Sequence, residues 1–456
     1  MSRLATHILA EQATAVSLSG IPDPVRQTAC RALIDTFGVA LAGSQTPVVR
    51  QLVAIPMTEG KAGILGYQQQ VSALEAARVN GCAAHALDFD DNCYAGFVHG
   101  SAVIVPAALA VAQQCHCDGE TLLASIVAGS ECQYRLGEAL GRTLYDRGWW
   151  TTGVLGVMGA AVAASHLLGL DVSRTAHAIA IALSATGGNK SAFGSDAKPV
   201  MAGLAAERGV LTAFMAQAGI TGPLNTLEHR YGLPRLMNGS DWQPERLDAS
   251  GWRLLSPGLD IKRLPVCLSS HAAVDAAVAL VHKHEITLDE IEMIRCDIPP
   301  VVAANLIYTS PCTAQEARFS LQYAVAAALY YGELTLSQLT REPLIPGPLQ
   351  GLMAKVSMVT SSQWEQPERL KSAPEGADVT IYLKDGQQFS KQVDRARGSA
   401  SLPLSDTELD EKFLACAQAA LSPLQSRRLL KELRAVDSLP SVLELNSTLE
   451  IPNHEL

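Results

Sequence analysis

Histidine and carboxylate side chains are dense in the sixteen-residue run HALDFDDNCYAGFVHG, which begins at His85. The run holds two histidines, three aspartates and an asparagine, and it contains no lysine or arginine. If the stretch is helical, His85, Asp88 and Asn92 share one face, because residues three and four apart are neighbours on a helix. His99 follows just before an apolar run that can form the next helix. A carboxylate cluster that ends in a histidine at a helix start suits proton transfer.

Other interpretations of this run lead to different chemistry. Asp90 and Asp91 fit a solvated helix end, and Ser101 is expected to cap the helix that follows. Asp88, Asp91 and Asn92 also offer oxygen atoms to a hard cation. A metal site would need a second group of ligands, and the sequence presents none, so we predict no bound metal.

Lys198 and Pro199 form a second candidate site. Proline is favoured in the first turn of a helix, and the pattern up to Ala218 is helical, so Lys198 is expected at a helix N-terminus. There, unpaired backbone N–H groups and the lysine ammonium would point to one spot, which suits a carboxylate. The alternative is an ordinary exposed lysine.

Two further segments carry side chains suited to acid–base chemistry. The segment IKRLPVC places Lys262 at the expected boundary between two domains, where ligand sites are common, and a buried lysine can act as a base. Tyr145 could donate a proton and Arg147 could hold a carboxylate. Taken without context, these last two residues fit an ordinary surface better.

Length, charge and cysteine content restrict the class of protein. A chain of 456 residues exceeds the size at which one core keeps growing, so two domains are expected. The net charge of −10 argues against nucleic acid as a partner, because a phosphate backbone requires a basic face. Ten scattered cysteines without CxxC pairs favour reduced thiols and a cytoplasmic location. The N-terminus lacks a signal-peptide core, and polar and glycine residues interrupt the most apolar segment, so we predict no membrane span.

The hydrophobic periodicity changes along the chain. Residues 1–260 show helical spacing with alanine-rich runs, which implies close helix packing. A GxxGxxG pattern at 153–159 follows no clear strand, so we interpret its glycines as helix-packing positions rather than a dinucleotide loop. Apolar and polar residues alternate at 294–298, and 379–389 has the signature of a hairpin.

These patterns predict a mainly α fold: a large all-helical domain with a smaller inserted α+β domain. Residues 1–260 form the helical domain in this scheme, and residues 261–402 form an α+β lid. A capping-box sequence at 405–408 then begins helices within 403–456, which we expect to return to the first domain.

Taken together, these segments resemble the MmgE/PrpD family, which includes 2-methylcitrate dehydratase, cis-aconitate decarboxylase and iminodisuccinate epimerase. The resemblance runs nearly end to end, through ALIDTFGVALAGS, HALDFDD followed by HGS, YDRGWWTTGVLGVMGAA, AKPVMAGLAAERG, IKRLPVCLSSHAAVDAA, EARFSLQY and LSDTELDEKFLACA. It implies a helical domain with a smaller lid, a homodimer, no cofactor or metal, and an active site in the cleft between the domains.

The resemblance also implies which residues line that cleft. Polar residues that line it in the decarboxylase match Asp88, Asn92, His99, Lys198 and Lys262 by position, and a tyrosine common in the family matches Tyr145. We therefore take as candidate catalytic residues Asp88, His99, Tyr145, Lys198 and Lys262, and as candidate substrate-binding residues Asn92, Arg147, Trp150, Cys267 and His271.

Three positions depart from the family pattern. Trp150 and Met201 stand where the family usually has histidines, and Cys267 stands where the decarboxylase has one. The loss of two histidines to Trp150 and Met201 predicts a pocket that is less basic and more apolar than the family usually has, whereas a cysteine at the position of Cys267 is common elsewhere in the family.

The family's reactions share a carbanion or enediolate that forms beside a carboxylate. We expect Lys198 to hold the substrate carboxylate. Lys262 and Tyr145 would act as opposed acid and base groups, and His99 and Asp88 would form a supporting proton relay. The leading expectation is a cofactor-independent lyase of the 2-methylcitrate dehydratase type, acting on a small di- or tricarboxylate. The alternatives are a dicarboxylate epimerase, a decarboxylase of the cis-aconitate type, and a binding protein that has lost turnover.

Overall fold

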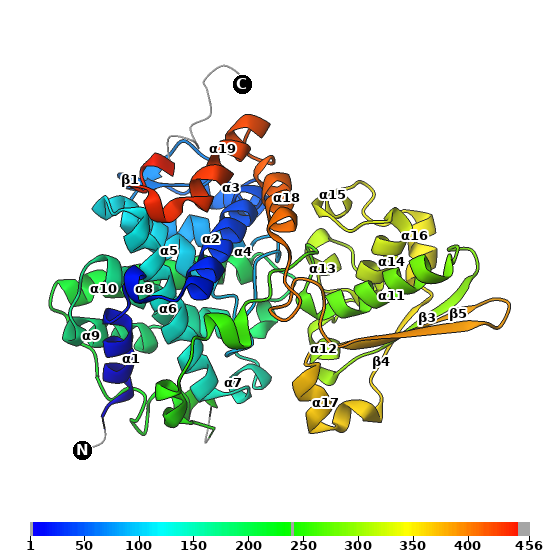
Figure 1. Cartoon of the computed structure of the whole chain (residues 1–456), viewed down its shortest axis with the longest axis horizontal. Helices are drawn as coiled ribbons and strands as arrows, with labels where there is room; N and C mark the ends of the chain where they lie inside the picture. Colours follow the sequence, from blue (N-terminus) through cyan, green and yellow to red (C-terminus); the bar gives the residue numbers. More distant parts are fainter. Residues whose placement is uncertain (1–2, 239–240, 446–456) are drawn as a thin grey trace. The chain divides into compact units, whose positions relative to one another are not determined.

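The computed structural model describes residues 3–238 and 241–445 of the chain. This part is mainly α-helical and carries a four-stranded sheet, which confirms the predicted fold class (Figure 1). Contacts divide the chain into two units. The helical unit comprises Met1–Ala86, Asp90–Ile261 and Ser405–Leu456, and the α+β unit comprises Leu87–Phe89 and Lys262–Leu404.

Helices build most of the helical unit. They are α1 (Ala5–Thr14), α2 (Asp23–Gly43), α3 (Pro47–Val53), α4 (Ala73–His85), α5 (Ser101–Cys115), α6 (Gly119–Leu140), α7 (Thr143–Asp146), α8 (Thr151–Leu167), α9 (Val172–Ser184), α10 (Ala197–Gln217), α18 (Asp406–Ala417) and α19 (Pro423–Arg434). At the starts of α4, α6 and α9, the side chains of Ser72, Asp118 and Asp171 accept a hydrogen bond from the backbone N–H three residues later. Helix α8 is buried almost all round and packs against α5, α6, α9 and α10 (Figure 1).

The glycines of the GxxGxxG pattern lie inside α8, as predicted for helix packing. A Cβ atom on Gly129 of α6 would lie 2.6 Å from the carbonyl oxygen of Gly159 in α8, so the two helices can approach this closely only with glycine at that position. The expectation of helix throughout 1–260 missed a short antiparallel pair, β1 (Glu59–Gly63) and β2 (Gln70–Val71). The sequence of β1, EGKAG, lacks the apolar alternation by which strands are identified.

A close crossing of α4 and α10 positions two residues of the candidate site. A Cβ atom on Gly203 would lie 2.1 Å from the carbonyl oxygen of Arg78, so the backbones can approach this closely only with glycine there. His85 ends α4 about two turns beyond Arg78, and Lys198 lies in the first turn of α10. The crossing therefore brings the end of one helix and the start of the other to the same region of the helical unit.

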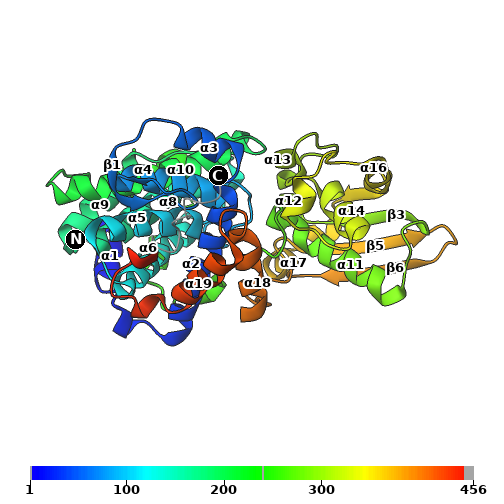
Figure 2. The same cartoon turned by 90° about the horizontal axis from the view of Figure 1, so that it is seen from above.

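The α+β unit is a four-stranded sheet with helices packed on it. Its strands are β3 (Ile291–Asp297), β4 (Val356–Val359), β5 (Ala377–Leu383) and β6 (Gln388–Val393), in the order β4-β3-β5-β6, with β3 and β4 parallel and the other pairs antiparallel. Its helices are α11 (His271–His284), α12 (Pro300–Asn305), α13 (Ala314–Ala317), α14 (Leu321–Tyr331), α15 (Leu336–Leu339), α16 (Gly347–Met353) and α17 (Pro367–Ser372). Strands β5 and β6 form the predicted hairpin, and α11 and α14 pack against the strands (Figure 2).

Helix α18 follows the α+β unit in the sequence and packs on α2 of the helical unit. Ser405 and Glu408 form the predicted capping box at its start. A Cβ atom on Gly38 of α2 would lie 3.1 Å from the ring of Phe413, so these two helices are in close contact. Within the described residues, every helix is too short or too polar to cross a membrane.

Candidate active site

The chain leaves helix α4 at His85 and enters a loop that continues to α5. The expectation that His85, Asp88 and Asn92 share a helix face is therefore wrong. Asp88 has a φ of 51°, in the left-handed region that aspartate tolerates better than most residues. Aspartate and asparagine side chains compete for backbone hydrogen bonds, so a run rich in both favours a loop over a helix.

The loop is fastened to the start of α8 by hydrogen bonds. Within the loop, the backbone groups of Cys93 and Val98 pair with each other at 2.8 and 3.0 Å, and two further bonds lead to α8. The hydroxyl of Thr151 donates to the carbonyl oxygen of Phe97, and the backbone N–H of His99 donates to Oγ1 of Thr152 at 3.0 Å. These contacts fix the position of His99 relative to α8.

One buried carboxylate is shared by two imidazoles in the helical unit. Nδ1 of His85 lies 2.9 and 3.0 Å from the two oxygens of Asp90, and Nδ1 of His99 lies 3.2 Å from Oδ2 of the same residue. His99 Nδ1 also lies 2.9 Å from the carbonyl oxygen of Asp91. The two rings are 4.7 Å apart, centroid to centroid. We name these three residues, His85, Asp90 and His99, the histidine–aspartate cluster.

The geometry of this cluster sets the tautomer of both imidazoles. Each Nδ1 atom faces only oxygen acceptors, so each Nδ1 carries the proton and donates it. Nε2 of His99 is then the nitrogen that can accept a proton from another molecule. This is the arrangement by which a buried aspartate orients a histidine base in hydrolases.

Burial controls the charges in the cluster. It lowers the pKa of His85 to about 4, so this imidazole is neutral near pH 7. Burial opposes the charge on Asp90, but the imidazoles of His85 and His99 outweigh it and hold the pKa of that carboxyl well below its usual range. The interpretation of Asp90 and Asp91 as a solvated helix end is therefore wrong, since their side chains are 0% and 1% exposed.

Asp91 is held by a different helix. Its carboxylate accepts a hydrogen bond from the hydroxyl of Ser101, the first residue of α5. Ser101 therefore does not cap α5 as predicted, because the residue before the helix is Gly100 and the Ser101 hydroxyl is directed to Asp91. Through its backbone carbonyl and its side chain, Asp91 links His99 to α5.

Asp91 should make the stability of the fold depend on pH. Burial raises the pKa of its carboxyl to about 7, from 3.8. Between these values the folded chain keeps a proton that the unfolded chain has released, so the free energy of unfolding falls as the pH rises through this window. The effect of this one group between about pH 5 and pH 8 is roughly 3 kcal/mol.

The Asp91→Asn variant tests this expectation, because asparagine does not titrate. Urea unfolding at about pH 5 and pH 8 should show that the variant loses less stability than the wild type between the two, by roughly 3 kcal/mol. The matched control is Asp146→Asn, at an exposed aspartate of α7, which should change the pH dependence little. An unchanged pH dependence in Asp91→Asn would show that Asp91 does not titrate in this range.

Trp150 and Lys198 surround the cluster within the helical unit. The Trp150 ring is 1% exposed and its centroid lies 5.2 Å from that of His85. Nζ of Lys198 lies 5.9 Å from the Trp150 centroid and 5.0 Å from that of Phe193. Lys198 is 5% exposed, which excludes an ordinary surface lysine. It lies in the first turn of α10, which confirms its predicted place at the start of a helix.

The backbone at the start of α10 offers less to an anion than the sequence suggested. The N–H of Lys198 donates to the carbonyl of Ser195 at 3.3 Å, the N–H of Val200 donates to that of Asp196 at 3.2 Å, and Pro199 has no N–H. The expectation of unpaired N–H groups at this point is therefore wrong at these positions. The ammonium of Lys198 is the group at this helix start that can attract a carboxylate.

A buried ion pair lies in the α+β unit. Nζ of Lys262, which is 0% exposed, donates to the carbonyl oxygen of Asp88 at 2.6 Å and lies 3.3 Å from its Oδ2. These two contacts from Lys262 offset the free-energy cost of the left-handed backbone at Asp88. Arg318 is buried as well: burial lowers the pKa of its guanidinium to about 10, and the charge of Asp88 opposes this shift. Sequence reasoning did not select Arg318, although it lies within the segment EARFSLQY.

Cys267 and His271 also belong to the α+β unit. The backbone N–H of Cys267 donates to the carbonyl oxygen of Arg318 at 2.9 Å, and its side chain is half-buried. His271 begins α11, and its Nε2 atom lies 3.2 Å from the carbonyl oxygen of Val266. Cys267 thus lies next to the Arg318 backbone in the α+β unit.

The remaining candidates lie elsewhere in the helical unit. Tyr145 is buried, contrary to the surface interpretation; its ring stacks on Phe97 at 5.3 Å, and Nζ of Lys190 lies 3.1 Å from its centroid. Arg147 follows the end of α7 and is exposed. Asn92 pairs through its backbone with Asp260, at 2.9 and 2.8 Å. The structure thus brings His99, Trp150 and Lys198 together around His85, and Asp88 together with Lys262.

The histidine–aspartate cluster also has residue types that bind transition metals. Donor atoms of its three residues lie within 4.8 Å of one another. In the structure, however, both oxygens of Asp90 and both Nδ1 atoms are engaged in hydrogen bonds with one another. These bonds account for the close approach of the donor atoms, and the absence of a metal remains a prediction.

Known proteins resemble the chain over nearly its whole length. It is 29% identical to the human cis-aconitate decarboxylase, over 95% of this chain and 92% of that protein. It is 28% identical to a cis-aconitate decarboxylase-like protein of Aspergillus oryzae, over 97% and 96%. Family models for the MmgE/PrpD N-terminal domain and the MmgE/PrpD C-terminal domain match residues 7–245 and 264–438. The chain therefore belongs to the MmgE/PrpD family.

Proposed function

We propose that this protein is a cofactor-independent lyase of the 2-methylcitrate dehydratase type, which acts on a small di- or tricarboxylate through a carbanion or enediolate. The observation that carries the proposal is the buried carboxylate of Asp90, shared by the imidazoles of His85 and His99. It leaves Nε2 of His99 as a proton acceptor that is held in place and oriented. Membership of the MmgE/PrpD family supports an enzyme of this kind.

In a dehydration, a base removes the proton from the carbon next to a carboxylate, and the electrons of that C–H bond form the enediolate. The hydroxyl on the neighbouring carbon then leaves with a proton from an acid, which gives an alkene and water. His99 is suited to the first step through its Nε2 atom. Lys262 is suited to the second step, as the acid. Its Nζ atom contacts two acceptor oxygens of Asp88, an arrangement that suits a protonated amine. Cations near the enediolate stabilise its charge.

Lys198 is assigned to the substrate carboxylate. The Lys198→Met variant keeps the length of the side chain and removes its charge. We expect the KM for the substrate to rise about tenfold to a hundredfold, since a hydrogen bond to a charged group is worth about 1.5–3 kcal/mol. Steady-state kinetics would measure this, with Lys431→Met, at an exposed lysine of α19, as the matched control. An unchanged KM would remove Lys198 from the binding site.

Decarboxylation of cis-aconitate is the second candidate, and the names of the relatives favour it. In that reaction a C–C bond breaks instead of a C–O bond: carbon dioxide leaves, and the carbanion takes up a proton. Trp150 argues for a changed specificity, because its indole occupies the space beside His85 and Lys198 where the family usually has a histidine. An epimerase would use proton abstraction and return without any loss of substrate.

Proton NMR in deuterated water tests these alternatives. The purified chain would be incubated, without added metal or nucleotide, with 2-methylcitrate, citrate, cis-aconitate and iminodisuccinate in turn. A new alkene signal from a hydroxy acid would establish the dehydratase, and loss of carbon dioxide from cis-aconitate the decarboxylase. Deuterium incorporation alone would establish proton exchange of the epimerase kind. No change with any compound, also in the Trp150→His variant, would contradict the proposal and favour a binding protein.

A further inference from the structure

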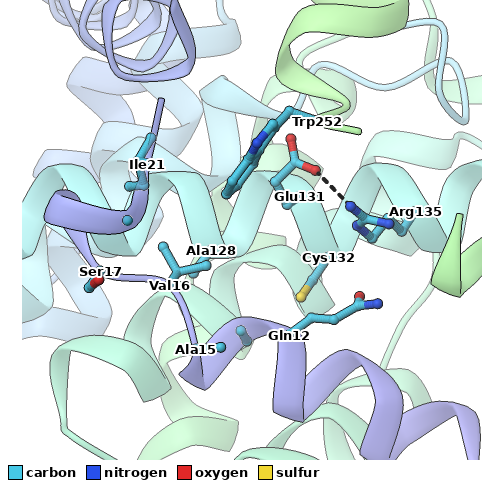
Figure 3. Close-up of a pocket in the computed structure, with 12 residues that line it drawn as sticks. Gln12, Ala15, Val16, Ser17, Ile21, Ala128, Glu131, Cys132, Arg135 and Trp252 are labelled. Atoms are coloured by element: carbon cyan, nitrogen blue, oxygen red, sulfur yellow. Dashed lines mark ion pairs between the residues drawn. The ribbon is translucent and has the colours of Figure 1, made fainter. Parts of the chain in front are cut away.

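The helical unit contains a cavity formed by residues outside the candidate active site. Its volume is about 310 Å³, at the small end of the range for ligand pockets. Its walls come from α1, from the segment after α1, from α6 and from the loop that carries Trp252. Figure 3 shows Gln12, Glu131 and Trp252 extending toward the cavity from three different segments. The apolar part of the lining includes Val16, Ile21 and Ala128.

Glu131 of α6 presents a buried carboxylate oxygen to this cavity. Its side chain is 5% exposed, and Oε1 accepts the backbone N–H of Leu254 at 2.9 Å. Among the residues that the structure describes, Oε2 has no hydrogen-bond partner. Its nearest cation is Arg135, at 3.6 Å from Nη2, which is an ion pair beyond hydrogen-bond distance (Figure 3).

Arg135 is directed away from Glu131 by other acceptors. Its Nη1 atom donates to the carbonyl oxygens of Leu247 and Ala249, at 3.2 and 2.6 Å, and Nη2 donates to that of Gly251 at 2.8 Å. Burial raises the pKa of the Glu131 carboxyl, and nearby donors and arginines offset this only in part. Among the described residues, Oε2 of Glu131 therefore keeps its capacity to accept a hydrogen bond.

Gln12 supplies a second acceptor to the same cavity. Its Nε2 atom donates to the carbonyl oxygen of Leu247 at 2.9 Å, which fixes the orientation of the amide. Within the described part of the chain, its Oε1 atom accepts no hydrogen bond. The cavity thus combines two acceptor oxygens, from Gln12 and Glu131, with the ring of Trp252 and an apolar wall. Arg135 also lines it, but its Nη atoms donate to backbone carbonyl oxygens.

We propose that this cavity binds a small organic ammonium ion: a primary amine with a short apolar body. The ammonium donates to Oε2 of Glu131 and Oε1 of Gln12, and the apolar body lies against Trp252, Val16 and Ile21. An indole face also attracts a cation. A carboxylate ligand would instead place a second negative charge beside Glu131, which costs free energy in a buried site. The inference does not depend on the reaction proposed above.

Calorimetric titration of the full chain with n-butylammonium tests the proposal. Butyrate and 1-butanol, which have the same apolar body, serve as comparison compounds. We expect saturable binding of one butylammonium per chain, and at least about tenfold weaker binding of the other two, because a charge-assisted hydrogen bond distinguishes them. Absence of butylammonium binding, or binding of butyrate with equal or greater affinity, would overturn the proposal.

Variants then locate the site. Glu131→Gln keeps the shape of the side chain and an acceptor for Leu254, and it should weaken butylammonium binding about tenfold or more. Glu207→Gln is the matched control and should bind as the wild type does, because this half-buried glutamate of α10 lies outside the cavity and pairs with Arg78 of α4. Gln12→Met removes the second acceptor at a half-buried position and carries the test if Glu131→Gln does not fold. Wild-type affinity in the folded cavity variants would place the binding elsewhere and overturn the proposal.

Discussion

Replacing Lys262 by methionine is expected to lower kcat by about 10²–10⁴-fold, the usual range for loss of a general acid or base. The side chain is fully buried, and its ammonium contacts both the backbone and the carboxylate of Asp88. Methionine fills the same space but has no proton to donate. The substitution should also destabilise the fold, by about 3–5 kcal/mol, because it removes the ammonium that pairs with the buried Asp88 carboxylate.

A double variant separates the two effects. Lys262→Met combined with Asp88→Asn removes both charges, and asparagine still tolerates the left-handed backbone at position 88. We expect this variant to regain most of the lost stability in urea unfolding and none of the lost activity. Lys283→Met, at an exposed lysine of α11, is the matched control and should change neither quantity. Full turnover by the folded Lys262→Met variant would exclude Lys262 from the chemistry.

The helical part of the fold was predictable because its pattern is local. Alanine-rich periodic runs gave the positions of α5, α6, α8, α9 and α10, and the first-turn proline gave the place of Lys198. The β5–β6 hairpin follows from alternation around a turn that contains Gly386. In each case, neighbouring residues carry the information that decides the local structure.

The histidine–aspartate cluster was not predictable in the same way. Asp90 can be buried because it pairs with His85, at the end of α4, and with His99, at the far end of the loop. His99 is held in turn by the hydrogen bond from its backbone N–H to the Thr152 hydroxyl of α8. Burial of Asp91 depends on the first residue of α5. From the sequence alone, two adjacent aspartates are better explained as solvated, since an unpaired buried charge is costly. Only tertiary contacts supply the partners that remove that cost.

Asp90→Asn is expected to lower kcat by about 10²–10⁴-fold, with little change in KM, although the substitution keeps the size and shape of the side chain. Two imidazole Nδ1–H groups donate to the Asp90 carboxylate. Asparagine offers one acceptor oxygen and one NH₂ donor. Nδ1 of His85 contacts both carboxylate oxygens, so it would meet the NH₂ group in either orientation of the amide, and Nδ1 of His99 would meet it when the NH₂ group takes the place of Oδ2. A ring that meets the NH₂ group must move its proton to Nε2, and if it is His99, the base is lost.

Nitrogen-15 NMR of the histidine side chains separates this positioning role from a purely structural one, and it needs no substrate. The wild type should show His85 and His99 as Nδ1–H tautomers, and Asp90→Asn should shift at least one of them to the Nε2–H tautomer. Asp437→Asn, at an exposed aspartate, is the matched control and should leave both tautomers and kcat unchanged. Unaltered tautomers in a folded Asp90→Asn variant would show that the carboxylate does not orient the two rings. The orientation of His99 would then rest on the carbonyl oxygen of Asp91, which its Nδ1 atom contacts at 2.9 Å, and Asp90 would have no positioning role.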